Sequence, residues 1–371
     1  MRRSSPAGCL FSLEAPPTER RRRAARGAPG ADAAPLPAIP PILETRRAQF
    51  RPLACSTVLN ENRNPTLPFR WTLNPYRGCE FGCTYCYAPY THRYLGQTDA
   101  ASFASRIYVK FQAPQVLAET LKPGMLKGRP LAMGTATDPY QPAEKRFRMT
   151  RRLLEVLARC PDLELSVTTK SPLIARDIDL LRRIARSGPL TVHVSLTTLN
   201  PGVARILEPH APTPRRRLET IGVLRSAGIE VGLFVMPILP GITDAPRELR
   251  ALLHAAKESG ASFAAAQMVR LFGPSWDLFD PVLRAHFPHL IGRYGALHAR
   301  GGLLEDDVAR PIRECFRAIR SELALDPPAR TTPPALTSED RNPLPDRTQV
   351  DGVRSEWLFS VEVGTPGVFR A

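Results

Sequence analysis

Three cysteines are the residues whose type and spacing point most directly to chemistry. Cys79, Cys83 and Cys86 form a C-x3-C-x2-C pattern. Gly78 and Gly82 each come directly before one of these cysteines. Glycine lets a loop curl tightly around an inorganic core. Three thiolates bind three irons of a 4Fe-4S cubane, which leaves the fourth iron without a protein ligand and open to a substrate. The pattern therefore predicts a reactive iron–sulfur cluster.

The same cysteines leave a zinc site open as an alternative. His92 is close in the sequence and would supply the fourth ligand of a tetrahedral site. The protein would then be a non-catalytic zinc or iron–sulfur module that binds nucleic acid. Zinc sites usually combine two separated pairs of ligands, whereas three thiols crowd together here. The spacing favours the iron–sulfur cluster.

Elements that would position the cysteines alternate along the chain, with strand-like segments separated by helical patterns. Strands are predicted at Trp71–Leu73, Leu131–Gly134, Leu163–Thr168, Leu190–Leu196, Val231–Met236 and Phe263–Val269, and helices at Arg151–Arg159, Ile174–Arg186, Arg215–Ala227 and Arg247–Ser259. This order implies right-handed crossovers and a parallel sheet with helices outside. The stretch is too short for eight units, so we expect an α/β fold with a partial (βα)6 TIM-like barrel. A doubly wound sheet is the alternative.

Composition divides the chain into four parts. Residues 1–50 are rich in Pro, Ala and Arg and predict a disordered basic tail. Residues 69–270 make up the expected barrel, and residues 271–325 a helical C-terminal extension. Residues 326–371 are expected to be mostly irregular. Trp357, Phe359 and Val361 alternate there, which leaves a short strand open.

The C-x3-C-x-aromatic-C motif after the first strand of a partial barrel resembles the radical S-adenosylmethionine superfamily. Three further stretches, Asn74–Tyr87, Gly134–Pro142 and Ser195–Thr198, resemble an uncharacterised bacterial branch related to spore photoproduct lyase. The likeness covers about Phe69 to Leu325. It implies that Cys79, Cys83 and Cys86 bind a 4Fe-4S cluster whose open iron holds S-adenosyl-L-methionine.

This resemblance also implies a reaction. An electron from a reductase, flavodoxin or ferredoxin would break a carbon–sulfur bond of S-adenosylmethionine and release a 5'-deoxyadenosyl radical. The radical would abstract hydrogen from a substrate that the sequence does not identify. The expected enzyme is therefore lyase-like or carries out another radical transformation, and the protein supplies orientation and exclusion of water.

Further cofactor-binding residues follow from the resemblance and from their places after strands. Tyr85 would pack on the adenine. Thr135, Thr137 and Asp138 follow the second strand and should face the barrel mouth, where a small polar loop suits the methionine group. An ordinary turn led by Asp138 and Pro139 is the alternative for this loop.

Lys170 ends the third strand, and Ser195 lies near the end of the fourth. Both resemble positions that hold the carboxylate and ribose of S-adenosylmethionine. A cation offsets the carboxylate charge, and a hydroxyl bonds the ribose or the amino group. Without the resemblance, these residues would be a surface charge and a locally bonded strand residue.

Several residues near these positions are left with open or structural roles. Glu208, His210 and Arg217 follow the fourth strand and are candidates to orient the cosubstrate or the substrate. His193 lies between valines on a buried strand, which favours a hydrogen-bonded core histidine. The other cysteines considered, Cys55, Cys160 and Cys315, are expected to be structural or incidental.

Thr135 marks a departure from the lyase, which places a hydrogen-donating cysteine at the matching position. The O–H bond of threonine is far stronger than the S–H bond of cysteine, so Thr135 is no replacement for that donor. This difference argues against repair of a thymine photoproduct by the lyase route, although Tyr85 and Tyr87 match the tyrosines of the lyase.

The charge and the apolar pattern of the sequence limit which partners and which cellular compartment we expect. The formal net charge is +16, and residues 1–51 hold ten arginines against four acidic residues. The basic remainder favours a polyanionic partner such as nucleic acid, with a solvated arginine-rich surface as the alternative. No apolar run reaches the roughly 18 residues of a membrane span.

Seven cysteines with three grouped together suit a metal site in a reducing cytoplasm. The oligomeric state stays open.

Overall fold

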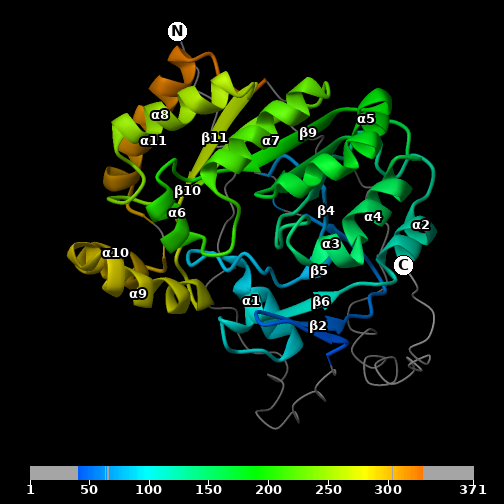
Figure 1. Ribbon diagram of the computed structural model, residues 1–371, viewed down its shortest axis with the longest axis horizontal. Coiled ribbons are helices and arrows are strands. Elements are labelled where there is room, and N and C mark those ends of the chain that lie inside the picture. The colour runs from blue at the N-terminus through cyan, green and yellow to red at the C-terminus, as the bar shows by residue number, and fades with distance from the viewer. Residues whose placement is uncertain (1–40, 63, 65–66, 303, 329–371) are drawn as a thin grey trace, which may run out of the picture.

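The computed structural model describes residues 41–328, apart from residues 63, 65–66 and 303 (Figure 1). Its larger sheet has seven strands in the order β11-β10-β9-β8-β7-β4-β3. These strands are β3 (Leu59–Glu61), β4 (Trp71–Leu73), β7 (Leu131–Met133), β8 (Leu165–Thr169), β9 (Leu190–Ser195), β10 (Glu230–Ile238) and β11 (Phe263–Met268). The six strands from β4 to β11 pair in parallel, and β3 is antiparallel to β4. The predicted partial (βα)6 barrel is therefore confirmed.

Helices connect successive parallel strands and cover the outside of the barrel. The main ones are α2 (Ala113–Thr120), α4 (Met149–Leu157), α5 (Ile178–Ser187), α7 (Pro214–Ser226) and α8 (Pro246–Glu258). In Figure 1, α4, α5, α7 and α8 follow one another along the outer side of the sheet. The helix expected from Ile174 starts instead with a 3-10 turn, η2 (Pro172–Asp177). The hydroxyl of Ser171 caps this turn by accepting the N–H of Leu173.

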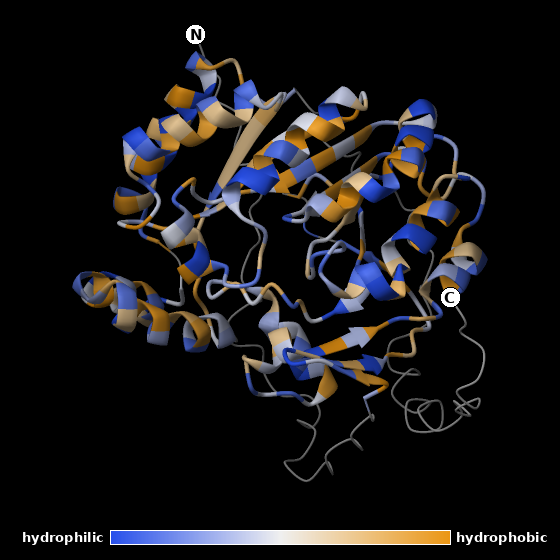
Figure 2. Ribbon diagram, viewed as in Figure 1, coloured by the Kyte–Doolittle hydropathy of each residue, from blue (hydrophilic) through white to orange (hydrophobic). Residues whose placement is uncertain are grey.

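The main hydrophobic core lies between the sheet and these helices. Leu131, Val167, Val192 and Val231 from neighbouring strands are fully buried. In Figure 2 the strands of the larger sheet are mostly in apolar colours, whereas the surrounding helices carry both blue and orange residues. Burial of each such side chain contributes about 1.5–3 kcal/mol, which anchors the loops at the strand ends.

A second, smaller sheet corrects the expected boundary of the N-terminal tail. Its strands are β1 (Leu43–Glu44), β2 (Gln49–Pro52), β5 (Tyr76–Arg77) and β6 (Arg106–Val109), in the order β1-β2-β6-β5. Residues 43–50 were expected to be disordered. Ala48 and Phe50 are instead buried against Ile107 and Val109, because strand pairing with β6 covers them. Residues 1–40 and 329–371, including Trp357, Phe359 and Val361, lie outside the described residues.

The C-terminal extension is helical, as predicted. It contains α9 (Pro274–His286), the 3-10 turn η3 (Pro288–Leu290), α10 (Ile291–Ala299) and α11 (Asp306–Glu322). Phe279, Leu283 and Tyr294 form a separate hydrophobic core with Tyr85 of the cysteine segment. The extension therefore braces the loop that carries the cysteines. Within the described part of the chain, no helix is long and apolar enough to span a bilayer.

Candidate active site

The three cysteines lie on one tight loop between β5 and the 3-10 helix η1 (Ala88–Leu95). All three thiols are free and half-buried. The N–H of Cys86 donates to the carbonyl of Cys83 at 3.1 Å, and the N–H of Cys79 donates to Phe103 O at 2.9 Å. Gly78 has a φ of +90°, and a Cβ there would lie 2.7 Å from Arg106 O. The curled loop thus depends on glycine, as the sequence predicts.

Cys83 and Cys86 line a pocket of about 210 Å³ where the parallel strands end. The rest of the lining combines aromatic, sulfur-containing and polar side chains from the cysteine segment, η1, β10, β11 and the residues that follow β8 and β11. These residues are Tyr85, Tyr87, Tyr90, Lys170, Met236, Pro237, Gln267, Met268, Arg270 and Phe272. Ligands bind at this end of parallel α/β sheets, so the thiols lie where a small molecule is expected.

Three free cysteines on one loop are the donor set that a 4Fe-4S cluster uses, so the residue types fit such a group. Burial raises the pKa of Cys83 to about 12, and burial also raises the pKa values of Cys79 and Cys86. A coordinated cation reverses this preference, because a metal-bound thiol is deprotonated. Among the described residues, no three His, Cys, Asp or Glu side chains are placed to hold a single metal ion. The donors of a cubane surround it and need not converge on one point.

His92 is not placed as the fourth ligand of a zinc site. Its buried ring packs 4.9 Å from Phe103 and 5.6 Å from Tyr108. Its Nδ1 lies 3.4 Å from the hydroxyl of Ser102. Burial, together with the charges of Arg77 and Arg106, lowers the pKa of His92 to about 4. The residue therefore belongs to the packing beneath η1.

A buried carboxylate, Glu208, joins the cysteine segment to the barrel. It accepts a hydrogen bond from the hydroxyl of Tyr85 and forms an ion pair with Arg217. Lys170 Nζ lies 3.7 Å from Glu208 Oε1. Burial alone would raise the pKa of Glu208, but Arg217 and Lys170 outweigh it and hold the pKa below its usual range. Glu208 and Arg217, open candidates in the sequence, thus form a buried ion pair that is hydrogen-bonded to Tyr85.

The structure brings Lys170 and Ser195 together from neighbouring strands. Lys170 Nζ donates to Ser195 Oγ at 3.2 Å. Burial alone would lower the pKa of Lys170, but Cys83 and Glu208 outweigh it and raise the pKa. The ammonium group therefore remains charged at the wall of the pocket, beside the cysteine loop.

The segment after β7 is bonded to the cysteine loop. The hydroxyl of Thr137 donates to Gly78 O at 2.6 Å, and Thr135 Oγ1 accepts a bond from Asn74 Nδ2 at 3.1 Å. Asp138 accepts the backbone N–H of Lys170 at 2.7 Å. These side chains fix the loop geometry. Their binding of a cofactor stays a prediction.

Some residues of this region were not singled out from the sequence. The Gln141 amide donates to Gly78 O and accepts the N–H of Glu80, so it clamps the loop. Lys110 is buried and donates to Asn74 O at 3.0 Å, and burial lowers its pKa to about 8. Gln141 lies in the motif after the second strand. Its long amide side chain there could have marked it as a residue that bonds a neighbouring loop. The sequence around Lys110 gave no such signal, because the partner of Lys110 is a backbone carbonyl 36 residues away.

Two structural interpretations from the sequence hold. His193 is buried, stacks on Phe234 with ring centroids 3.9 Å apart, and lies 3.3 Å from Thr168 Oγ1. The expected hydrogen-bonded core histidine is confirmed. The cysteines outside the loop, Cys55, Cys160 and Cys315, are partly buried against the main core. His210 is exposed, and its N–H donates to Phe81 O at 3.3 Å.

Comparisons with known proteins agree with this geometry. Residues 73–253 match the family model described as the radical SAM superfamily. An uncharacterised protein of Mycobacterium tuberculosis, Rv2578c, is 34% identical over 286 residues, which cover 77% of this chain and 84% of that protein. An uncharacterised protein of Methanocaldococcus jannaschii, MJ0683, is 30% identical over 183 residues, covering 49% of this chain and 66% of that protein.

A solved structure of similar fold is spore photoproduct lyase complexed with dinucleoside spore photoproduct. The TM-score is 0.54 at 15% identity, and the match covers 78% of this chain and 85% of that chain. At this identity the likeness concerns the fold alone.

Proposed function

The chain belongs to the radical SAM superfamily and is an enzyme of radical chemistry, and we propose that Cys79, Cys83 and Cys86 hold a 4Fe-4S cluster beside a pocket for S-adenosylmethionine. When bound, the cluster supplies the electron that cleaves S-adenosylmethionine to a 5'-deoxyadenosyl radical, which abstracts hydrogen from the substrate. The observation that carries this proposal is the position of the thiols. Two of them line a pocket at the strand ends, together with Tyr85 and Lys170.

In this proposal the residues of the pocket wall bind and orient the cosubstrate. Lys170 offsets the methionine carboxylate, and Ser195, 3.2 Å from it, bonds the amino group or the ribose. Tyr85 packs on the adenine. Its hydroxyl is bonded to Glu208, which Arg217 keeps ionised, so the ring is held in one orientation. Thr135, Thr137 and Asp138 shape the loop around the methionine group.

A nucleic acid is the substrate class that we favour within this proposal. The net charge of +16 supports it through attraction to phosphates. The fold match is to a lyase complexed with a dinucleoside photoproduct. Thr135 argues against the same repair reaction, because its O–H bond is far stronger than the S–H bond of a cysteine, so the hydroxyl does not replace a thiol as hydrogen donor. The reaction on the substrate is therefore a different radical transformation.

The test uses two cysteine variants of the anaerobically reconstituted protein. Cys83→Ala removes a proposed ligand, and Cys160→Ala removes a thiol that packs against the main core instead. We expect Cys83→Ala to lose the iron–sulfur absorption and at least 100-fold of 5'-deoxyadenosine formation. Cys160→Ala should retain both. Equal losses in the two variants would contradict the ligand assignment, and a colourless zinc-containing wild type would support the non-catalytic nucleic-acid-binding module instead.

A further inference from the structure

The 3-10 helix η1 holds an aromatic ring out to solvent. Its residues Ala88, Pro89 and His92 are buried, whereas Arg93 and Tyr94 are exposed. Tyr94 is 72% exposed, the largest value among the exposed large hydrophobic side chains in the described part of the chain. A ring of this size at the surface gives up the burial that would stabilise the fold, and such rings are common in binding surfaces.

An arginine from β5 lies over this ring. Arg77 Cζ is 6.0 Å from the centroid of the Tyr94 ring, and Arg77 Nη1 donates to Thr91 O at 3.3 Å. A guanidinium group is attracted to the face of an aromatic ring. Because Tyr94 is mostly exposed with the guanidinium group on one face, its other face is accessible to a planar ligand. Together the two side chains offer a stacking surface and a positive charge.

Tyr90 joins this stacking surface to the pocket. It lies one turn before Tyr94 on η1 and lines the pocket beside the cysteines. Burial raises the pKa of Tyr90, Tyr94 raises it further and Arg77 lowers it, so the three side chains are neighbours. The exposed ring therefore lies next to a residue of the pocket wall.

Arg93 brings a second cation close to the pocket lining. Its Nη2 would lie 3.8 Å from a Cβ at Gly273, and Gly273 directly follows Phe272 of the lining. No residue of η1 is acidic. We define the η1 surface as Arg77, Tyr90, Arg93 and Tyr94. This surface combines two aromatic rings with two cations, the combination that proteins use to bind unpaired nucleotides.

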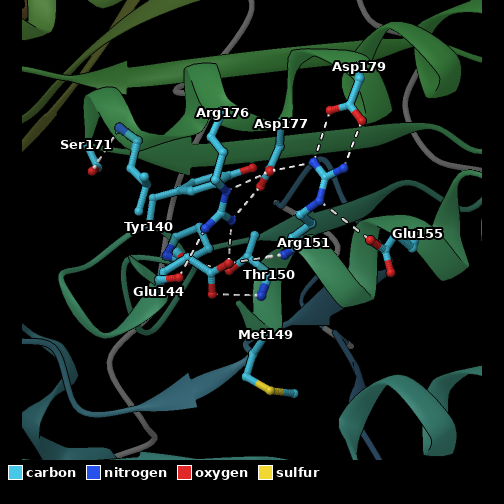
Figure 3. A network of polar contacts seen from close by, with 12 residues as sticks. Tyr140, Glu144, Met149, Thr150, Arg151, Glu155, Ser171, Arg176, Asp177 and Asp179 are labelled. Atoms are coloured by element: carbon cyan, nitrogen blue, oxygen red, sulfur yellow. Dashed lines mark hydrogen bonds and ion pairs between the residues drawn. The ribbon is translucent and has the colours of Figure 1, made fainter. Parts of the chain in front are cut away.

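A buried network holds the strand beneath the η1 surface. Tyr76, the residue before Arg77, donates to Glu144 at 2.5 Å. Glu144 also accepts a bond from Arg176 at 2.6 Å and the N–H of Thr150 at 2.9 Å (Figure 3). The backbone that carries Arg77 is therefore fixed before a ligand binds, and a pre-organised surface loses less conformational entropy on binding.

We infer that the η1 surface binds single-stranded nucleic acid, with one base stacked on Tyr94 and a neighbouring phosphate paired with Arg93. This inference rests on the proposed function, because it gives the favoured substrate class a binding surface beside the same pocket. The bases of a single strand are unpaired, so their faces are free to stack on an aromatic ring. Tyr90 then continues the path of the strand to the pocket.

The stacking surface distinguishes a single strand from a duplex. Inside a duplex, neighbouring base pairs cover both faces of each base, which leaves Tyr94 without a ring to stack on. A duplex is held by its phosphates alone, through release of counterions. Duplex binding is therefore expected at low salt, but without a contribution from Tyr94.

The experiment measures fluorescence anisotropy of labelled nucleic acids with the full-length reconstituted protein. The probes are a single strand of about 12 deoxythymidines, a uridine strand of the same length and a DNA duplex of the same length. Tyr94→Ala should weaken binding of at least one single strand about tenfold and leave binding of the duplex within about twofold of the wild type. Tyr94→Phe keeps the ring and should retain wild-type affinity.

Val223→Ala is the matched control for loss of an exposed apolar side chain. Val223 is also large and exposed, but it lies on α7 at the outside of the barrel. Its substitution should change the affinity for each probe by less than about twofold. The iron–sulfur absorption of every variant checks that the cysteine loop is intact.

Arg93→Gln tests the phosphate contact. Removal of one contact to a single strand should reduce the slope of the logarithm of affinity against the logarithm of salt concentration by about 0.7. Arg183→Gln, at an exposed position of α5, is the control and should keep the wild-type slope. Equal slopes in the two variants would contradict the role of Arg93.

Unchanged single-strand affinity in Tyr94→Ala would overturn the inference, and so would an equal loss for single strand and duplex. Formation of 5'-deoxyadenosine by the wild type separates this result from the proposed function. A wild type that forms 5'-deoxyadenosine but binds no strand through Tyr94 overturns the η1 surface and leaves the radical enzyme intact. A wild type that binds a strand through Tyr94 but forms no 5'-deoxyadenosine supports the η1 surface and contradicts the proposed function.

Discussion

At the scale of single residues, the partners of buried charges decide what the site can bind. Glu208 would be an unfavourable group inside the protein without Arg217, Lys170 and the Tyr85 hydroxyl around it. Because these donors satisfy the carboxylate, it remains ionised and keeps Lys170 charged in return. The wall of the pocket therefore presents a fixed cation at the position where a carboxylate ligand is proposed.

His92 gives a prediction about pH at this scale. Burial and the neighbouring Arg77 and Arg106 hold its pKa at about 4 in the folded chain. An unfolded histidine binds its proton near pH 6.5, so the unfolded state gains protons first and the free energy of unfolding falls as pH drops below that value. Between pH 7 and pH 5 this contribution is about 2 kcal/mol.

The variant His92→Gln should lose this part of the pH dependence. Urea unfolding of the wild type and the variant at pH 7 and pH 5 measures it. Ser102 and Tyr108 also contact the ring, but neither titrates in this range. Identical losses of stability in the two proteins would show that His92 titrates normally.

At this scale the sequence predicted the candidate residues of the site better than it predicted the hydrogen-bond partners of their side chains. Cys79, Cys83 and Cys86 were evident from spacing, and Lys170 and Ser195 meet as their strand positions suggested. Thr137 and Asp138 were expected at the mouth, yet their side chains bond Gly78 O and Lys170 N. The direction of a short polar side chain depends on which unsatisfied backbone group lies nearby, and this is set by the fold.

At the scale of elements, the site is two loops locked to each other. The loop after β5 carries the cysteines, and the segment after β7 is bonded to it through Thr137 and Gln141. Both bonds end on the carbonyl of Gly78, and this glycine also packs against Arg106 O. Any change at Gly78 therefore acts on the cysteine loop and on its support together.

Gly78→Ala should destabilise the protein and impair cluster retention. The substitution combines a φ of +90° with a Cβ only 2.7 Å from Arg106 O and 2.9 Å from Phe103 O. Gly124→Ala is the matched control, because Gly124 has a φ of +75° and nothing within 4 Å of the added Cβ. Denaturant unfolding should show a loss of about 3 kcal/mol for Gly78→Ala and about 1 kcal/mol for Gly124→Ala. Similar losses would mean that the close approach is relieved by a small shift.

The barrel strands were predictable because each is a short apolar run followed by a helical pattern. All six parallel strands lie within two residues of their expected bounds. The small sheet was missed because β1, β2 and β5 have two to four residues and no apolar alternation of their own. The pairing of β2 and β5 depends on β6, and β6 lies more than fifty residues further along the chain than β2. Such long-range pairing leaves no local signal.

At the scale of the whole molecule, the chain is strongly basic, and its proposed site lies at the carboxyl ends of the parallel strands. An enzyme that acts on a neutral small molecule does not need a net charge as large as +16 to attract its substrate.

Binding of duplex DNA tests the role of the net charge. If the basic surface serves a nucleic acid, the logarithm of the affinity should fall linearly with the logarithm of salt concentration, because phosphate contacts release counterions. Fluorescence anisotropy with a labelled duplex between low and physiological salt measures the slope. Undetectable binding at low salt would remove nucleic acid as the favoured substrate class.

The most direct test of the central claim is electron paramagnetic resonance of the anaerobically reconstituted and reduced protein, before and after S-adenosylmethionine is added. The account predicts a 4Fe-4S signal that changes when the compound binds at the iron without a cysteine ligand, followed by formation of 5'-deoxyadenosine. A reduced protein with no paramagnetic iron–sulfur signal and intact S-adenosylmethionine would contradict it.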